Sequence, residues 1–170
     1  MSPNDILRRV RYIFDFNDKK MIAIFKQGDR KTDRTEISNW LKKDEDPDWV
    51  AIYDDDLARF LSGLIIERRG KKEGPPPVAE KSLSNNIVLR KLKIAMNFRS
   101  EDILETLARA DLQVSKYELS AFFRKPTHKH FRKCKDQILR NFLKGLQLKI
   151  HSEKDTSAKP KESPPTPPSS

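Results

Sequence analysis

The side chains best suited to chemistry lie in one basic stretch, residues 124–135. It contains six Lys or Arg and two His but no acidic residue, and Phe131 stands among the charges. Lysine and arginine bind the phosphates of a nucleic acid, and an aromatic ring can stack on a base. We therefore predict a contact with DNA, RNA or another polyanion at this stretch. Its contact residues are expected to be Arg124, Lys125, Lys129, His130, Arg132, Lys133 and Lys135.

The same stretch also permits a simpler interpretation. Phe131 could fill the core beneath the loop, as Trp49 could at the matching position of the first sequence copy described below, while the charges are merely solvated. A basic patch alone is a weak indication of nucleic-acid binding. Both interpretations therefore stay open at this point.

Residues 112–120 resemble the turn and second helix of a helix-turn-helix unit. Ser115 stands where a helix cap is expected, and Lys116 and Tyr117 would lie on the exposed face of the following helix. Gln113, however, occupies the place where this turn usually has glycine. A capped second helix is common in any helical bundle. Lys116 and Tyr117 are added to the predicted contact residues, with groove reading and plain bundle packing as the two interpretations.

His128, His130 and Cys134 are the side chains of this region that could bind a metal ion. Their spacing, His-x-His-x3-Cys, matches no standard zinc pattern, and the sequence has no second cysteine. It also shows no serine–histidine–aspartate arrangement, no paired catalytic carboxylates and no glycine-rich phosphate loop. We therefore expect a non-catalytic binding protein with no metal site, no small-molecule cofactor and no catalytic residue.

The elements that must position these residues occur twice in the sequence. Residues 4–66 match a second copy at a constant offset of 82, without a gap. The identities fall on apolar, polar and glycine positions, and include the pairs Asn4 and Asn86, Phe60 and Phe142, and Gly63 and Gly145. Identities scattered over a stretch of this length indicate an internal duplication.

Apolar residues within each copy follow a helical period. In the first copy Ile6, Val10 and Ile13 form one such stripe, and three further stripes follow it along the chain. No segment alternates with period two, so no sheet is expected. The predicted fold class is all-α, with two tandem four-helix modules at 3–68 and 86–150, a Pro- and Gly-rich linker at 69–85, and a disordered tail at 151–170.

Three of the expected helices begin at recognisable capping residues. Asp33 and Ser115 each stand three residues before a glutamate, which is the spacing of a capping box. Ser100 precedes two acidic residues and is expected to cap the second helix of the second copy.

The two copies differ in net charge. Residues 4–66 carry 12 basic and 13 acidic residues, whereas residues 86–150 carry 15 basic and 6 acidic residues, so the net charges are −1 and +9. The counterpart of the basic stretch, residues 42–53, has four acidic residues and two lysines. An alternative prediction follows, in which the acidic stretch of one module binds the basic stretch of the other, within one chain or between two chains of a homodimer. An acidic partner protein could take the same basic site.

Composition places further bounds on the protein. No run of apolar residues approaches the ~18 needed to span a bilayer, and the N-terminal residues have no apolar core of a signal peptide. The single cysteine excludes a disulfide within the chain. We therefore expect a cytoplasmic protein with no membrane contact.

Three segments carry a family resemblance. They are Asn-Asp-Ile-Leu-Arg-Arg-Val-Arg-Tyr at 4–12, Glu-Leu-Ser-Ala-Phe-Phe-Arg-Lys-Pro at 118–126, and Cys-Lys-Asp-Gln-Ile-Leu-Arg-Asn-Phe-Leu-Lys-Gly-Leu at 134–146. These segments resemble the YehS-like family of small bacterial cytoplasmic proteins, and the resemblance covers residues 3–150. It implies two tandem copies, a bacterial origin and a cytoplasmic location. Since the family is a domain of unknown function, the resemblance implies no activity, cofactor or catalytic residue.

Overall fold

The computed structural model describes residues 1–75 and 78–158, with side chains as far as residue 154. All regular structure in these ranges is helical, which confirms the prediction of an all-α fold with two four-helix modules. Module 1 consists of α1 (Pro3–Phe14), α2 (Asp18–Gln27), α3 (Arg34–Leu41) and α4 (Asp54–Arg69). Module 2 consists of α5 (Asn85–Met96), α6 (Ser100–Arg109), α7 (Lys116–Phe122) and α8 (Asp136–Ala158).

Short polar side chains fix most of the helix starts. Asp33 accepts a hydrogen bond from the backbone N–H of Glu36, and Ser115 accepts one from that of Glu118, so both predicted caps are formed. The predicted cap at Ser100 is wrong, because α6 already begins at this residue. Arg99 occupies the cap position instead, and its backbone N–H donates to the Asp102 carboxylate at 2.7 Å.

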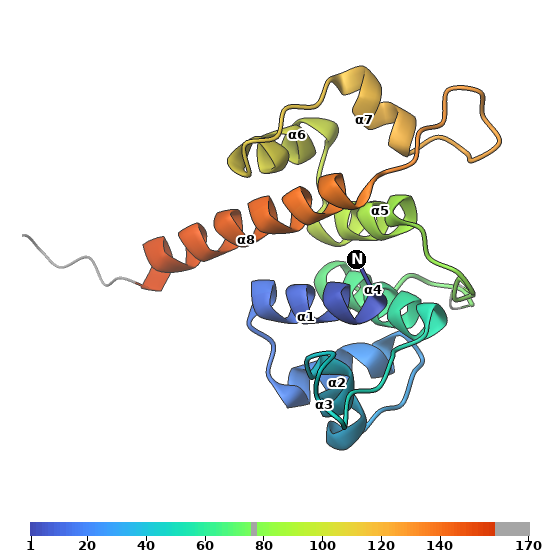
Figure 1. The fold of residues 1–170 in the computed structure, drawn as a ribbon, viewed down its shortest axis with the longest axis vertical. Coiled ribbons are helices and arrows are strands. Elements are labelled where there is room, and N and C mark those ends of the chain that lie inside the picture. The colour runs from blue at the N-terminus through green and yellow to red at the C-terminus, as the bar shows by residue number, and fades with distance from the viewer. Residues whose placement is uncertain (76–77, 159–170) are drawn as a thin grey trace, which may run out of the picture.

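The helices form a central group with an outer pair on either side. Figure 1 shows α1, α4, α5 and α8 across the middle of the molecule, with α6 and α7 above them and α2 and α3 below. The modules cross over: the fourth helix of each packs against the first helix of the other, α4 on α5 and α8 on α1. Each fourth helix also packs against the second helix of its own module, α4 on α2 and α8 on α6. The two modules are therefore joined by half of their helices.

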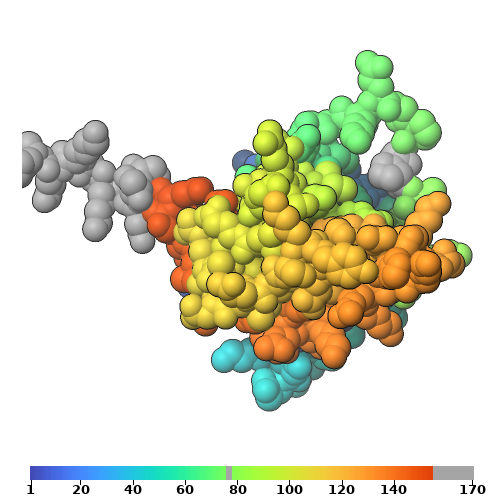
Figure 2. Space-filling model, turned by 90° about the horizontal axis from the view of Figure 1, so that it is seen from above, coloured from blue at the N-terminus to red at the C-terminus, as the bar shows by residue number. Residues whose placement is uncertain are grey.

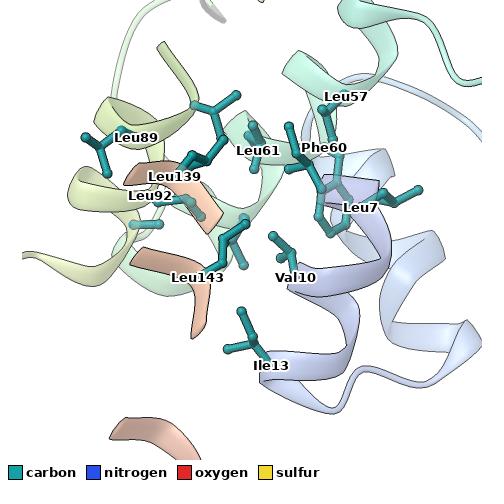
Figure 3. Close-up of a cluster of buried hydrophobic side chains, with 14 of the residues drawn as sticks. Leu7, Val10, Ile13, Leu57, Phe60, Leu61, Leu89, Leu92, Leu139 and Leu143 are labelled. Atoms are coloured by element: carbon teal, nitrogen blue, oxygen red, sulfur yellow. The ribbon is translucent and has the colours of Figure 1, made fainter. Parts of the chain in front are cut away.

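The core is continuous across the two modules. Figure 3 shows apolar side chains of α1 and α4 meeting those of α5 and α8, and all of the labelled residues belong to one buried cluster. Burying a leucine side chain stabilises the fold by about 2 kcal/mol. A single module would expose much of this surface to water. The labelled residues are Leu7, Val10, Ile13, Leu57, Phe60, Leu61, Leu89, Leu92, Leu139 and Leu143.

Contacts between the modules repeat with the sequence offset. The amino group of Met1 lies 2.7 Å from Oδ2 of Asp136, at the start of α1 and α8. Eighty-two residues on, the backbone N–H of Leu83 donates to Oδ2 of Asp54 at 2.9 Å, at the start of α5 and α4. The paired helices in each case begin together and run parallel.

Two glycines allow the fourth helices to approach closely. A Cβ added to Gly63 would lie 1.9 Å from the carbonyl oxygen of Ile24 on α2, and one added to Gly145 would lie 1.9 Å from that of Thr106 on α6. Glycine inside a helix costs about 1 kcal/mol relative to alanine. Its presence at both positions is therefore explained by helix packing.

The ends of the repeats differ from expectation by a few residues, and the first and last residues of the predicted linker, Arg69 and Asn85, belong to α4 and α5. Helix α8 continues to Ala158, so residues 151–158, expected in the tail, are helical. The rest of the predicted tail, residues 159–170, lies outside the described residues, as do residues 76 and 77 of the predicted linker. No helix in the described ranges is both long and apolar enough to cross a bilayer.

Candidate nucleic-acid interface

A buried asparagine fixes the basic loop, which we define as residues 124–135. Asn86 on α5 donates from Nδ2 to the carbonyl oxygens of Phe122, at 3.0 Å, and Arg132, at 2.8 Å. Its Oδ1 accepts from the backbone N–H of Cys134 at 3.0 Å. One side chain therefore holds the last residue of α7, just before the loop, and two residues near the end of the loop. All three partners are backbone groups, so the clamp leaves the loop side chains free to vary.

The same clamp holds the acidic loop, residues 42–53, in module 1. Asn4 donates to the carbonyl oxygens of Trp40 and Val50, and accepts from the backbone N–H of Ile52. Each partner lies 82 residues before its counterpart in module 2. The two loops therefore share one backbone arrangement while they carry opposite charges.

Inside the loops the turns also correspond. The backbone N–H of His130 donates to Nδ1 of His128 at 3.0 Å, and that of Asp48 donates to Oδ1 of Asp46 at 2.9 Å. The backbone bond from His128 to the carbonyl of Lys125 has its counterpart in the one from Asp46 to Lys43. The ring of His128 thus performs the turn-forming role that an aspartate performs in the acidic loop. In that role Nδ1 is already engaged by a backbone N–H.

The basic side chains of the loop point into solvent. Six of the seven predicted contact residues in it are exposed, and Arg124 is half-buried. Figure 2 looks down on module 2 and shows the loop, in orange, along the rim of this face. Among the described residues, no acidic side chain forms an ion pair with any of its Lys or Arg.

The acidic loop behaves differently. Asp44 lies 3.6 Å from a guanidinium nitrogen of Arg8, and Asp48 lies 3.8 Å from Nζ of Lys42. Both ion pairs stay within module 1. No ion pair joins the two loops in the described part of the chain, and α3 and α7 lie at opposite ends of the molecule in Figure 1. The structure therefore does not contain the pairing of the loops within one chain.

Cys134, and not Phe131, inserts into the core from the basic loop. Its side chain is buried in the common cluster, where Ile52 occupies the equivalent position in module 1. Phe131 and Trp49 are both only half-buried and neither is part of that cluster, so the interpretation of Phe131 as a core residue is wrong. Burial, followed by the nearby Asp136 carboxylate, raises the pKa of the Cys134 thiol to about 12. A thiol held neutral in this way is a poor metal ligand.

The two loop histidines, unlike Cys134, are not buried. Their rings are 5.6 Å apart and exposed to solvent. Within the described ranges, no group of three or more His, Cys, Asp or Glu is arranged to hold a metal ion.

The helix-turn-helix candidate is small. Helix α7 has seven residues, Lys116 to Phe122, which is about two turns. Tyr117 is 60% exposed, and Nζ of Lys116 lies 3.9 Å from a carboxylate oxygen of Glu101. These residues lie on the outer side of module 2, and an acidic neighbour partly neutralises the lysine. Of the predicted contact residues, Lys116 and Tyr117 are therefore less well placed for phosphate than those of the basic loop.

A second group of cations was not predicted from the sequence. Arg9 of α1 and Arg140 of α8 line one hollow, although they belong to different modules. The helical spacing of Arg140, Lys144 and His151 was a detectable signal, since these residues share one face of a helix. Their proximity to Arg9 could not be read from either copy alone, because it depends on how the modules cross over.

The fold and the loop define a class of protein: a helical tandem repeat that presents one charged, asparagine-clamped loop from each module. The chain belongs to the family described as "Protein of unknown function (DUF1456)", whose model matches residues 3–70 and 85–151. It is 42% identical over 155 residues to "Uncharacterized protein YehS" of Escherichia coli (strain K12), which covers 91% of this chain and 99% of that protein. These matches confirm the family resemblance. No solved structure matches the chain.

Proposed function

We propose that this protein is a non-catalytic, cytoplasmic nucleic-acid-binding protein that contacts phosphates through the basic loop of module 2. The observation that carries the proposal is the exposure of five Lys and Arg side chains in the loop, none with an ion pair in the described residues. When cations without acidic partners bind phosphates, the nucleic acid releases its condensed counterions, and this release drives association. Elsewhere in the protein basic side chains are commonly paired, as Arg30 is with Glu36 and Asp56.

Phe131 adds a contact of a different kind. It lies half-buried at the end of the turns, between exposed Lys and Arg side chains, and outside the core cluster. An aromatic ring among cations offers a base a surface for stacking. Lys116 and Tyr117 of α7 would extend the surface in the same module. The loop therefore combines the two contacts typical of nucleic-acid recognition.

Reversing four loop charges is expected to abolish binding. The variant carries Lys129→Glu, Arg132→Glu, Lys133→Glu and Lys135→Glu, all at exposed positions, so the fold should be retained. Binding of labelled duplex DNA and single-stranded RNA is measured by fluorescence anisotropy between about 50 and 200 mM salt. Over this range, added salt lowers the affinity of a protein that makes several phosphate contacts by about 10³-fold or more. Loss of four such contacts should leave no measurable binding at the upper salt concentration.

The control changes charge equally elsewhere. The double variant Lys19→Glu and Lys26→Glu lies on α2 of module 1, at exposed positions, and can be compared with a double reversal at Lys129 and Lys133. Equal losses in the two double variants would mean that only net charge matters. If the unmodified protein binds neither nucleic acid at the lowest salt, the proposal is wrong. Salt-sensitive dimerisation without such binding would favour the alternative, in which the acidic loop of one chain binds the basic loop of another.

A further inference from the structure

A surface hollow follows the junction of α1 and α8, which we call the α1–α8 seam. The two helices run parallel, from the contact of Met1 with Asp136 at one end to that of Tyr12 with His151 at the other. The hollow at its start has a volume of about 320 Å³. Its lining residues are Met1, Asp5, Arg8, Arg9 and Arg140.

Three cations converge along this seam. Arg9 reaches it from module 1 and Arg140 from module 2. Lys144 follows Arg140 by four residues, so it lies on the same face of α8. In the equivalent junction of α4 and α5, Lys91 stands at the position of Arg9 and Ser62 at that of Lys144. These two residues are in direct contact, since Nζ of Lys91 donates to Oγ of Ser62 at 2.9 Å. The repeat therefore places Lys144 beside Arg9.

The seam between α4 and α5 provides an internal comparison. There Lys91 corresponds to Arg9 and is neutralised by Glu80 at 3.1 Å, while Ala58 stands at the position equivalent to Arg140. At these three equivalent positions the α4–α5 seam has one cation, which is paired, whereas the α1–α8 seam has three. Clustering of like charges is destabilising unless an anion is bound between them.

The acidic groups near the α1–α8 seam are already bound. Burial raises the pKa of the Asp5 carboxyl, but hydrogen bonds from the backbone N–H of Ser2 and from Arg8 lower it by more, so the net pKa is lowered. The Asp136 carboxylate accepts from the Met1 amino group and from Asn85. In the described residues no ion pair involves Arg9, Arg140 or Lys144, and Nε of Arg9 is buried without a hydrogen-bond partner.

An aromatic pair, of which Tyr12 is the exposed member, completes the seam. The ring of Tyr12 is 5.4 Å from that of His151, and Tyr12 is 56% exposed. The corresponding residues of the other seam, Ile94 and Arg69, offer no aromatic surface. A tyrosine ring beside cations can stack on a base only if that base is unpaired, because a duplex covers the faces of its bases.

We propose that the α1–α8 seam binds a single-stranded nucleic acid, with phosphates at Arg9, Arg140 and Lys144 and a base stacked on Tyr12. The inference rests on the proposed function for its ligand class and adds a separate site and a preference for single strands. Helix α8 begins immediately after Lys135, so one strand can pass from the basic loop onto the seam. The loop alone would hold phosphates of either form of nucleic acid.

Two variants test the seam independently of the basic loop. Arg140→Glu with Lys144→Glu should weaken binding of a single-stranded oligonucleotide by about 10-fold or more at constant salt, since each reversal removes a phosphate contact. Tyr12→Ala should weaken single-strand binding by at least about 5-fold, the effect of one lost base stack. It should leave binding of duplex DNA unchanged. The matched control is again Lys19→Glu with Lys26→Glu, which makes the same change in net charge.

Single-stranded RNA and DNA of one sequence serve as separate probes, and a difference between them shows whether the 2′-hydroxyl contributes. If both seam variants bind single strands as the control does while loop reversal still abolishes binding, the seam inference is overturned and the proposed function stands. If the unmodified protein binds neither probe, both are overturned. Equal losses of single-strand and duplex binding in Tyr12→Ala would also overturn the preference for single strands.

Discussion

Gly145→Ala is expected to destabilise both modules together, by about 2 kcal/mol or more. The added Cβ would lie 1.9 Å from the carbonyl oxygen of Thr106, and a backbone atom of α6 cannot yield without separating the two helices. Alanine recovers about 1 kcal/mol of helix propensity, which offsets only part of this cost. Because α8 also packs on α1, its displacement disturbs module 1 as well.

Tryptophan fluorescence reports on the module that was not mutated. Both tryptophans of the chain, Trp40 and Trp49, lie in module 1. The urea midpoint from fluorescence should therefore fall together with the midpoint from circular dichroism when Gly145 in module 2 is changed. Lys144→Ala, an exposed change on the same helix, should shift neither by more than about 0.5 kcal/mol. An unchanged fluorescence midpoint would show that the modules unfold independently and that the core is not shared.

Asn86→Ala is expected to cost about 3 kcal/mol, because it leaves two carbonyl oxygens and one backbone N–H near the core without partners. It should also release the basic loop. Trypsin cleaves after Lys and Arg, so the rate of cleavage within residues 124–135 should rise more than the loss of global stability accounts for.

Asn4→Ala is the matched control for that variant. It removes the equivalent three hydrogen bonds in module 1 and should cost a similar free energy of unfolding. It should not accelerate cleavage in the basic loop beyond the global effect. A cost below about 1 kcal/mol for Asn86→Ala, or equal cleavage of the basic loop in both variants, would contradict the clamp.

The tandem helical fold could be predicted because its signals are local. Apolar spacing and caps such as Ser115 depend only on neighbours in sequence, and the repeat is visible in identities such as Asn4 and Asn86. The role of these asparagines was not predictable, since their partners lie about 36 to 48 residues away. The packing of each fourth helix on the other module was also not predictable, because an apolar stripe shows that a helix face is buried but not which helix covers it.

The candidate site also has a part that could be predicted from the sequence and a part that could not. The basic loop was evident from composition, and its exposure agrees with the inversion of charge between residues 124–135 and their counterpart, residues 42–53. The core residue of the loop was not evident. Phe131 is the larger apolar side chain, but the clamp at Cys134 turns that residue inward and leaves Phe131 at the surface boundary. Hydrophobicity alone could not choose between them.

One scaffold thus supports two different loops. The asparagine clamps bind only backbone atoms. Most loop side chains therefore have no structural role, apart from the residue that enters the core and the turn-forming Asp46 or His128. The loop of module 1 carries acidic residues at these unconstrained positions, and the loop of module 2 carries basic ones. The duplicated fold therefore presents one acidic and one basic loop, and the proposed function assigns nucleic-acid binding to the basic one.

The most direct test is to map the bound surface on the intact protein. Amide chemical shifts are recorded by nuclear magnetic resonance while a single-stranded oligonucleotide is added at low salt. The proposed function predicts that the largest changes fall in residues 124–135 and, by the further inference, along α1 and α8 near Arg9, Tyr12 and Arg140. The acidic loop, residues 42–53, should remain unchanged and serves as the internal control. Changes centred on that loop, or none at all, would contradict the assignment of nucleic-acid binding to the basic loop.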